Sequence, residues 1–527
     1  MNQTLLVADS VRTADGVGGN AVLVEGDRIV AVGSADELRS TSSGEQRLPG
    51  ATIVAGLIDA HMHPVGYAAA LQRPSLKAAA NFAEISDILR EALDRQAPET
   101  AITALRLDDE SLAEGRLPDR QLLDAISAER PILLMRYCGH VAVANTAALR
   151  LAAIDRTSAD PVGGVIDRDD GGHPTGVLRE TAFEPVTAAL RPLAPPLTPD
   201  HISQALTALA ATGLTGVGAM AATDSGLWGG ASSELEVLLE ASRDSAIQLD
   251  IMVIARTPAA LRSAAESIDD VGGQARFVGV KMFSDGSLGG HTAAMHQPFT
   301  DKPDETGTDR LDPSWALEMA QSALDLNGRV AIHAIGDKAN SGVLDLMEHL
   351  ISSGADPAML RIEHASVLTE ADIVRFGLLG ITASVQPAFI ASETGWLEKR
   401  VGPKRILHTY PFRSLAAAGA PLAGGSDCPV EPPHPLLGMA AARDRLGLVP
   451  QEALSAQAAL HLFTEGAAAA LGRDARITSG SAANFTVLDI DPVSATPDQL
   501  RQATVISTWV NGSPVAIPDD TVTWQEE

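Results

Sequence analysis

Gly56-Leu57-Ile58-Asp59-Ala60-His61-Met62-His63-Pro64 joins the end of an apolar run to a His-x-His pair. The run from Ala51 to Ile58 predicts a buried strand, and the proline after the second histidine predicts where that strand stops. Because side chains two positions apart on a strand lie on the same face, His61 and His63 should leave the strand end side by side. Two neighbouring imidazoles suit one metal ion, although on spacing alone a surface or core pair is an equally good interpretation.

Strand and helix patterns alternate through the middle of the chain. Helical patterns such as Ser314–Leu326, Lys338–Ser352 and Thr369–Phe376 separate most of the strand-like segments. Strands that alternate with helices predict a parallel sheet, and eight of them close a (β/α)8 TIM barrel, an α/β fold. The eight candidate strands are 53–60, 213–219, 248–255, 277–283, 329–333, 360–364, 381–386 and 421–426.

Both ends of the chain are rich in strand patterns, and Asn511-Gly512 is a strong hairpin-turn signal near the C-terminus. We expect one small composite β-sandwich domain built from residues 1–52 and 472–527, with the barrel in residues 53–471. The interval between the first two barrel strands is far longer than a βα loop needs. We interpret residues from about 65 to 205 as an inserted lid or substrate segment over the C-terminal face of the barrel, where active sites of this fold lie.

Composition narrows the class of function. The chain has 527 residues with 67 acidic and 39 basic side chains, a formal charge of −28, which disfavours nucleic acid or an anionic membrane as partner. Two cysteines are too few for a disulfide framework. A basic and apolar leader is not evident, and the apolar runs are shorter than the roughly 20 residues that span a bilayer. We therefore expect a cytoplasmic enzyme with a small-molecule substrate.

Residues that can bind metal stand at the ends of four more predicted strands. Taken singly, a histidine there is more often an ordinary polar residue, the lysine a snorkelling side chain, and the aspartate equally often the N-cap of the next helix. The C-terminal ends of barrel strands converge on one mouth, however, and agreement across five strands is hard to explain by chance. Together with the His-x-His pair, these residues predict a metal site: Lys281, His333, His364 and Asp427.

This set of residues resembles the amidohydrolase superfamily, and its dinuclear-metal pattern in particular. Finer motifs resemble the amidohydrolase 3 family, in the YtcJ-like branch that includes N-substituted formamide deformylase, and the likeness covers nearly the whole chain. The sequence departs from the usual pattern at Asn484, where an aspartate is common, and at Lys338, where an arginine is usual. The motifs are residues 280–288 (VKMFSDGSL), 333–339 (HAIGDKA), Gly139-His140 with Asn145, 176–180 (GVLRE) and 482–489 (AANFTVLD).

The resemblance implies how metals would be held. His61 and His63 would bind the more buried metal with Asp427, and His333 and His364 would bind the other. Lys281 as an ammonium is only a hydrogen-bond donor, so the resemblance implies that its amine reacts with CO2 and that the carbamate bridges both metals. The alternative is an unmodified Lys281 and a single metal. Imidazole-rich ligands favour zinc, with one or two ions per chain, although iron or manganese fits nearly as well.

The expected chemistry is hydrolysis of a carbon–nitrogen bond, in an amide, N-acyl, N-formyl or cyclic amide substrate. Metal binding would bring the pKa of a water toward neutrality, and Asp427 would act as general base and then general acid. The same site could serve an esterase, a lactonase or a deaminase. A more distant alternative is a non-catalytic barrel that binds a metal or ligand, but such a site has no use for Asp427 as a proton shuttle.

Four further residues are candidates for substrate binding, and each could equally serve a turn or cap. They are His140, Asn145, Glu180 and Asp285. We interpret His291, His296 and His434 as surface histidines on loops, and Cys428 as a small buried residue. The resemblance also implies a possible homodimer.

Overall fold

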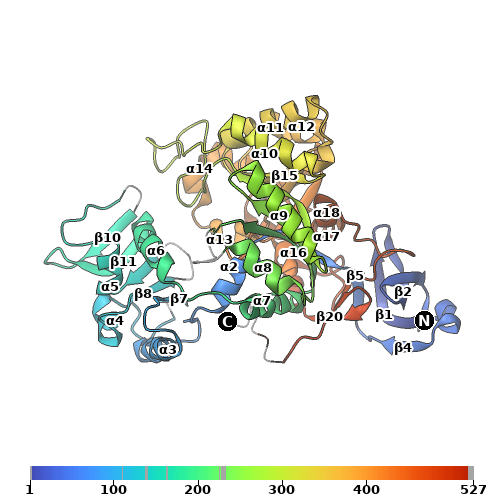
Figure 1. Cartoon of the computed structure of the whole chain (residues 1–527), viewed down its shortest axis with the longest axis horizontal. Coiled ribbons are helices and arrows are strands. Elements are labelled where there is room, and N and C mark those ends of the chain that lie inside the picture. Colours follow the sequence, from blue (N-terminus) through green and yellow to red (C-terminus); the bar gives the residue numbers. More distant parts are fainter. Residues whose placement is uncertain are drawn as a thin grey trace. The chain divides into compact units, whose positions relative to one another are not determined.

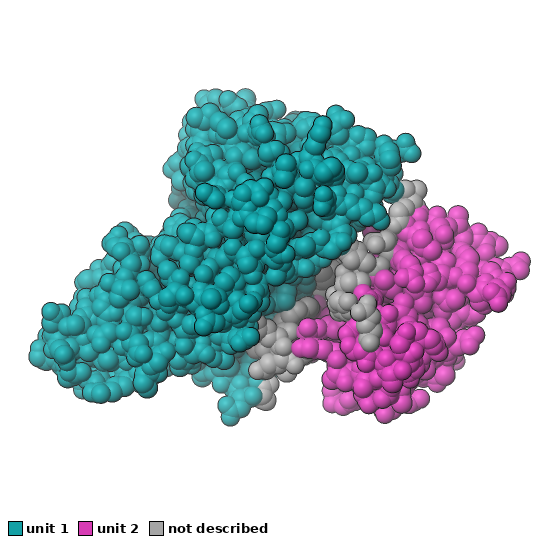
Figure 2. All heavy atoms as spheres, turned by 180° about the vertical axis from the view of Figure 1, so that it is seen from behind, with its two compact units in different colours: residues 1–67, 202–223, 238–523 teal, residues 68–201, 224–237, 524–527 magenta. Residues whose placement is uncertain are grey.

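The computed structural model describes residues 3–109, 111–136, 141–161, 164–224, 226, 233–519 and 521 (Figure 1). The chain divides into two compact units (Figure 2). Unit 1 comprises residues 1–67, 202–223 and 238–523, and unit 2 comprises residues 68–201, 224–237 and 524–527.

The main sheet of unit 1 has eight parallel strands. Each strand pairs with the next along the chain, so the order is that of a barrel laid open. From one end to the other, the strands are β18 (Leu422–Gly424), β17 (Thr382–Val385), β16 (Leu360–His364), β15 (Arg329–Ala334), β14 (Ala275–Phe283), β13 (Gln248–Ile254), β12 (Leu214–Ala222) and β6 (Leu57–Met62).

The two end strands, β6 and β18, are joined by hydrogen bonds just beyond β18. The buried Asp59 carboxylate accepts from the backbone N–H groups of His61 at 3.0 Å and Ser426 at 3.1 Å. The Asp427 N–H donates to the His61 carbonyl, and the His63 N–H donates to the Cys428 carbonyl, both at 2.8 Å. These bonds bring the first and last strands together and make the sheet a nearly closed barrel.

The predicted barrel is therefore confirmed, with one correction at its first strand. The segment expected as a single strand, 53–60, is two strands, β5 (Thr52–Ala55) and β6, separated at Gly56. Strand β5 belongs to the sheet of the chain termini. A Cβ at Gly56 would lie 2.4 Å from Thr215 Oγ1, so only glycine allows this close approach where the chain enters the barrel.

Helices follow the barrel strands, as the sequence predicted (Figure 1). Helix α9 shows why: the Thr257 side chain caps its first turn, and its buried residues, such as Leu261, Ala265 and Ile268, recur at helical spacing on one face. The helices are α7 (Pro199–Ala211), α8 (Glu234–Ser242), α9 (Pro258–Val271), α10 (Pro313–Asp325), α11 (Asp337–Ser352), α12 (Glu370–Leu379), α13 (Phe389–Glu393), α14 (Leu397–Arg405), α15 (Phe412–Ala417), α16 (Pro435–Asp444), α17 (Ala456–Leu462) and α18 (Glu465–Ala470).

Strands from both chain termini form a second eight-stranded sheet of unit 1. Phe485 and Trp509 stack in its core with ring centroids 5.2 Å apart. Its description as a β-sandwich stays a prediction. The strand order is β21 (Ser513–Pro514), β20 (Val505–Val510), β19 (Phe485–Leu488), β5, β1 (Gln3–Thr13), β2 (Gly16–Glu25) and β3 (Arg28–Gly33), with β4 (Gly44–Arg47) beside β1. The helices near the two ends of the chain are α1 (Ala35–Leu38), α2 (Pro64–Leu71) and α19 (Pro497–Gln502).

Unit 2 has its own five-stranded sheet and its own apolar cores. Its helices begin at side-chain caps, Asn81 for α3 and Asp119 for α4, close to the helix starts expected from the sequence. The function of this segment as a lid stays a prediction. The strand order is β10 (Gly164–Arg168), β11 (Pro174–Glu180), β9 (Val141–Ala144), β8 (Ile132–Arg136) and β7 (Ile102–Leu107), with α3 (Phe82–Arg95), α4 (Arg120–Ile126), α5 (Thr146–Leu151) and α6 (Glu184–Leu190).

Within the described ranges, we find no helix with the length and apolarity that crossing a bilayer requires.

Candidate metal centre

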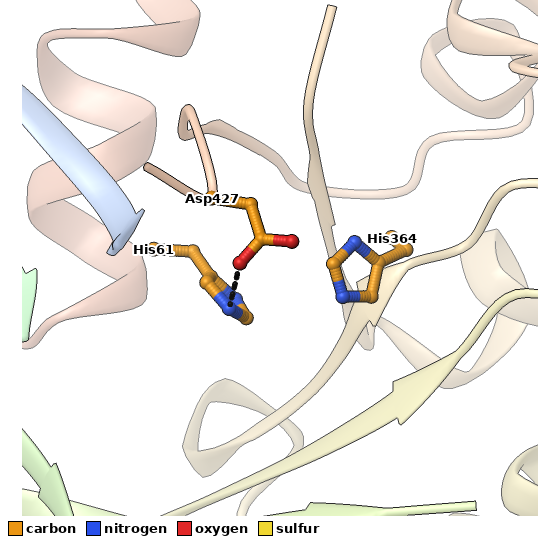
Figure 3. A group of neighbouring side chains, drawn as sticks. All are labelled: His61, His364 and Asp427. Atoms are coloured by element: carbon orange, nitrogen blue, oxygen red, sulfur yellow. Dashed lines mark ion pairs between the residues drawn. The ribbon is translucent and has the colours of Figure 1, made fainter. Parts of the chain in front are cut away.

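Three predicted ligands meet where β6, β16 and β18 end, as Figure 3 shows for His61, His364 and Asp427. One possible ligand atom from each lies within 4.8 Å of those of the other two. Asp427 Oδ1 lies 3.3 Å from His61 Nε2 and 3.3 Å from His63 Nε2. The rings of His333 and His364 are 4.5 Å apart, so all five side chains gather at the C-terminal end of the barrel.

These spacings fit a divalent metal. Zinc binds imidazole nitrogen and carboxylate oxygen at about 2.0–2.2 Å in a tetrahedral arrangement, which places neighbouring ligand atoms roughly 3.4 Å apart. The two 3.3 Å separations around Asp427 Oδ1 match that edge length. Asp427 Oδ1 therefore lies at a ligand-to-ligand spacing from both histidines, while the group whose ligand atoms all lie within 4.8 Å of one another is His61, His364 and Asp427.

Hydrogen bonds behind the histidines set which ring nitrogen faces the site. His61 Nδ1 lies 2.7 Å from a Glu363 oxygen, and His364 Nδ1 lies 2.7 Å from Gln386 Oε1. His333 Nε2 lies 2.9 Å from the Gly286 carbonyl. When each of these acceptors takes an N–H, the opposite nitrogen of the ring is the one that faces the site, and its unprotonated form is the one that binds metal.

Glu363 is the buried carboxylate that orients His61. Burial alone would raise its pKa, but the Arg361 guanidinium and His61 outweigh burial and hold the pKa of Glu363 well below its usual value. Arg361 Nε lies 2.6 Å from Glu363 Oε1, and its Nη2 donates to the Ala60 carbonyl at 3.1 Å. Both side chains are fully buried. An ionised Arg361–Glu363 pair in contact with His61 therefore lies in the barrel interior.

Lys281 lies inside the barrel on β14, only 1% exposed. Its Nζ is 3.7 Å from the centroid of the Phe283 ring. Burial lowers the pKa of Lys281 to about 8, although the carboxylates of Glu363 and Asp427 act in the opposite direction. At neutral pH, a lysine with this pKa is in its neutral, nucleophilic amine form far more often than a surface lysine is.

The charge states of two ligands also suit metal binding. Burial would raise the pKa of Asp427, but hydrogen bonds with His61 and His63 hold it well below its usual value. Burial and the neighbouring His333 hold the pKa of His364 well below its usual range, so that ring is neutral.

His364 and Asp427 also have φ values of 74° and 56°, left-handed conformations that cost energy for residues other than glycine. Such strain is typical of functional positions.

Asp285 connects the loops beside the site through hydrogen bonds. Its carboxylate accepts from the N–H groups of Ala294, Ile335 and Gly336 at 2.8–3.1 Å and lies 3.2 Å from His333 Nε2. These contacts explain its burial, and its role in substrate binding stays a prediction.

Asn145 lies buried in unit 2, where it caps α5. Its amide accepts from Ile132 and Ala148 and donates to the carbonyls of Ser127 and Arg130. His140 and the side chain of Glu180 lie outside the described residues. Substrate binding by these three residues stays a prediction.

The remaining histidines differ from one another. His296 is exposed, and His291 pairs with Asp301 at 3.2 Å. His434 is buried at the start of α16, so its interpretation as a surface residue was wrong. Cys428 is buried, as expected.

Sequence reasoning missed three residues that support the site: Asp59, Glu363 and Gln386. Each is a polar side chain next to a predicted ligand or at the end of a barrel strand, and each is buried. Asp59 precedes His61 by two positions and Glu363 precedes His364 directly. A charged residue inside an apolar strand needs a buried partner, so the charges of Asp59 and Glu363 within such strands could have indicated that they support the site.

Glu431, on the loop after β18, gives a testable pH dependence. Burial raises its pKa to about 7. The negative charge of Glu393 also raises this pKa, whereas the hydrogen bond from Ser392 lowers it. The folded chain therefore keeps this proton at pH values where the unfolded chain has lost it, and stability falls as the pH rises from about 4.5 to 7, by about 3 kcal/mol. We expect Glu431→Gln, which stays neutral, to stabilise metal-free protein at pH 8 relative to wild type, and far less at pH 4.5.

Urea unfolding of both proteins at the two pH values measures this difference. Glu398→Gln, at an exposed position of α14, is the matched control and should show no such pH-dependent gain. An equal effect of Glu431→Gln at both pH values would mean that Glu431 titrates normally.

Comparison with known proteins agrees with this geometry. The model of the amidohydrolase family matches residues 48–516, and that of a bacterial imidazolonepropionase-like composite domain matches residues 21–41. YtcJ of Bacillus subtilis (strain 168) is 31% identical over 522 residues, covering 93% of this chain and 95% of YtcJ. The N-substituted formamide deformylase of Arthrobacter pascens is 28% identical, covering 97% of this chain and 98% of the deformylase.

A solved structure is similar over almost the same length. An uncharacterized metal-dependent hydrolase from Pyrococcus furiosus superposes with a TM-score of 0.71 at 27% identity, covering 93% of this chain and 100% of that one. The resemblance inferred from the strand-end motifs is thus confirmed by sequence and by fold. With a family match across the barrel and its ligand residues, this chain belongs to the amidohydrolase family.

Proposed function

We propose that this protein hydrolyses a carbon–nitrogen bond of an amide-like small molecule, with a divalent metal, preferably zinc, held by His61, His63 and Asp427. The observation that carries the proposal is the position of Asp427 Oδ1, 3.3 Å from both His61 Nε2 and His63 Nε2. One carboxylate oxygen faces the ligand histidines, and the other would carry out the proton transfer. The relative named N-substituted formamide deformylase supports N-formyl and N-acyl compounds as the first substrates to test.

A metal bound at these residues supplies an acidified water and a Lewis acid for the substrate carbonyl. The protein's own task is to orient the ligands and to move protons. Asp427 Oδ2 takes a proton from the attacking water and delivers it to the leaving nitrogen, so that an acid and an amine are released. Glu363 and Gln386 keep His61 and His364 in the tautomers that accept a metal.

Lys281 is part of the same proposal. Its amine would react with CO2 to give a carbamate and a proton, which would turn a hydrogen-bond donor into a carboxylate-like metal ligand. Its burial and its pKa of about 8 support this reaction. His333 and His364 would hold the second ion, since their rings lie 4.5 Å apart beside the first site.

Metal content per chain, measured by elemental analysis on protein purified without added metal, tests the site. We expect about two ions in the wild type and fewer in Lys281→Ala, with reconstitution of the wild type depending on bicarbonate. Lys399→Ala, at an exposed position of α14, is the matched control and should keep the wild-type content. One ion in both wild type and Lys281→Ala would remove Lys281 from the ligand set, and no metal would overturn the metal-dependent proposal.

The bond type needs a separate assay. Loaded enzyme should release an amine from N-formyl or N-acyl compounds faster than it cleaves esters and lactones of the same acyl group or deaminates aromatic amines. Turnover of esters, lactones or aromatic amines alone would keep the metal centre and replace the proposed substrate class.

A further inference from the structure

Unit 2 contains an open surface cavity of about 370 Å³ whose charged lining is mainly basic, with Arg150, Arg156 and His173 exposed to solvent. The residues that line it come from α4, from α5 and the loop after it, and from the turn between β10 and β11. They include Arg120, Arg150, Arg156 and His173, with Leu149 and Pro174 as apolar surface. The predicted metal ligands all lie in unit 1, so the proposed hydrolytic chemistry does not account for this cavity.

Close packing positions Arg120 in the cavity wall. Arg120 is the first residue of α4, and a Cβ at Gly176 of β11 would lie only 2.9 Å from the Arg120 Cβ. Gly176 also has a φ of 99°, so glycine is required there both for space and for backbone conformation. The Arg120 guanidinium donates to Thr146 Oγ1 at 3.4 Å, across the cavity wall from α4 to α5.

Arg168 holds together the two loops that carry Arg156 and His173. Its guanidinium donates to the Asp155 carbonyl at 3.2 Å and to the Gly172 carbonyl at 3.1 Å. The cavity wall is thus tied by backbone contacts, and the guanidinium of Arg156 is not used for this purpose. A wall held in this way is preorganised for a ligand.

The one carboxylate in the lining is already engaged. Asp155 accepts from the N–H and hydroxyl of Thr157, both at 2.7 Å, and from the N–H of Ser158. Among the residues that the structure describes, Arg120, Arg150 and Arg156 form no direct ion pair with a carboxylate, although Asp169 interacts electrostatically with Arg120 and His173. Three such guanidinium groups around one cavity are notable in a chain with a formal charge of −28, where acidic partners are abundant.

We propose that this cavity binds a phosphate monoester of a small organic molecule. Planar guanidinium groups bind phosphate oxygens in pairs, and three of them can balance a doubly charged group. The volume of about 370 Å³ exceeds that of a phosphate alone and falls in the range of small-molecule sites. Leu149 and Pro174 provide apolar contact for the organic part.

Isothermal titration calorimetry of the full-length protein with phenyl phosphate tests the proposal. We expect one site per chain, weaker binding of inorganic phosphate, and about tenfold weaker binding of phenyl phosphate to Arg150→Gln and to Arg156→Gln, since each loses a charge-assisted hydrogen bond. Arg191→Gln changes the same charge at an exposed position of unit 2 outside the cavity lining and should bind as wild type does.

A second measurement uses the wild type alone, so it does not depend on the variants folding. Phenyl phosphate should protect Arg150 and Arg156, but not Arg191, from modification by phenylglyoxal, read by peptide mass spectrometry. The proposal is overturned if phenyl phosphate does not bind, if Arg150→Gln and Arg156→Gln bind it as wild type does, or if benzoate binds equally well. Unprotected Arg150 and Arg156 would overturn it too.

Discussion

Asp427→Asn should lower kcat by about 10³-fold, the typical contribution of a positioned general base. Asparagine keeps the size of the side chain and one oxygen that can face His61 and His63, but its amide cannot take a proton from water. The Asp427 side chain is only 14% exposed and lies 3.3 Å from both histidines, so few other groups can take this proton. Amine release from an N-formyl substrate, compared at equal metal content, measures the effect.

Metal content separates loss of chemistry from loss of the site. An Asp427→Asn variant that holds metal and has lost activity supports a hydrolytic enzyme, whereas unchanged function would favour the non-catalytic barrel. Asp309→Asn, an exposed aspartate on the loop after β14, is the control for a simple change of charge and should keep full activity.

Glu363→Gln should destabilise the fold and weaken metal binding together. The substitution leaves the fully buried Arg361 without its carboxylate, and breaking a buried ion pair in this way costs about 3–5 kcal/mol. Glutamine can still face His61, but its amide can present N–H instead of oxygen and no longer enforces one tautomer. We therefore also expect roughly 10–100-fold weaker metal affinity.

A double variant separates the two effects of this substitution. In Arg361→Met with Glu363→Gln, the uncompensated charge is gone, so the free energy of unfolding should recover most of the loss. Metal affinity should stay low, because His61 still lacks its anionic partner. Recovery of both properties in the double variant would show that Glu363 acts only through Arg361 and does not position His61.

The barrel was predictable from the sequence because its strands are mostly apolar and are separated by amphipathic helices. The candidate ligands could be proposed because they stand where those strands end, and their role as ligands stays a prediction. The break at Gly56 was not, since residues 51–58 are continuously apolar and only the close approach to Thr215 shows that two sheets share the segment.

The supporting residues were harder to predict for a physical reason. Glu363 and Gln386 act through partners on other strands: Glu363 on β16 faces His61 on β6, and Gln386 follows β17 and faces His364. These pairings depend on three-dimensional neighbours, which local periodicity does not encode. The basic cavity in unit 2 was missed for the same reason, since Arg120 and His173 lie far from Arg150 and Arg156 in the sequence.

The bonds that join β6 to β18 have a thermodynamic consequence. Asp59, His61 and His63 meet Ser426, Asp427 and Cys428 there, so the predicted metal ligands come from both strands that close the barrel. An ion bound by His61, His63 and Asp427 is a cross-link between the N-terminal and C-terminal ends of the barrel sequence. The unfolded chain holds these ligands hundreds of residues apart, so linkage requires metal binding to favour the closed barrel by mass action. If the proposed metal site is correct, metal supply sets the resistance of the whole barrel to unfolding as well as its catalytic capacity.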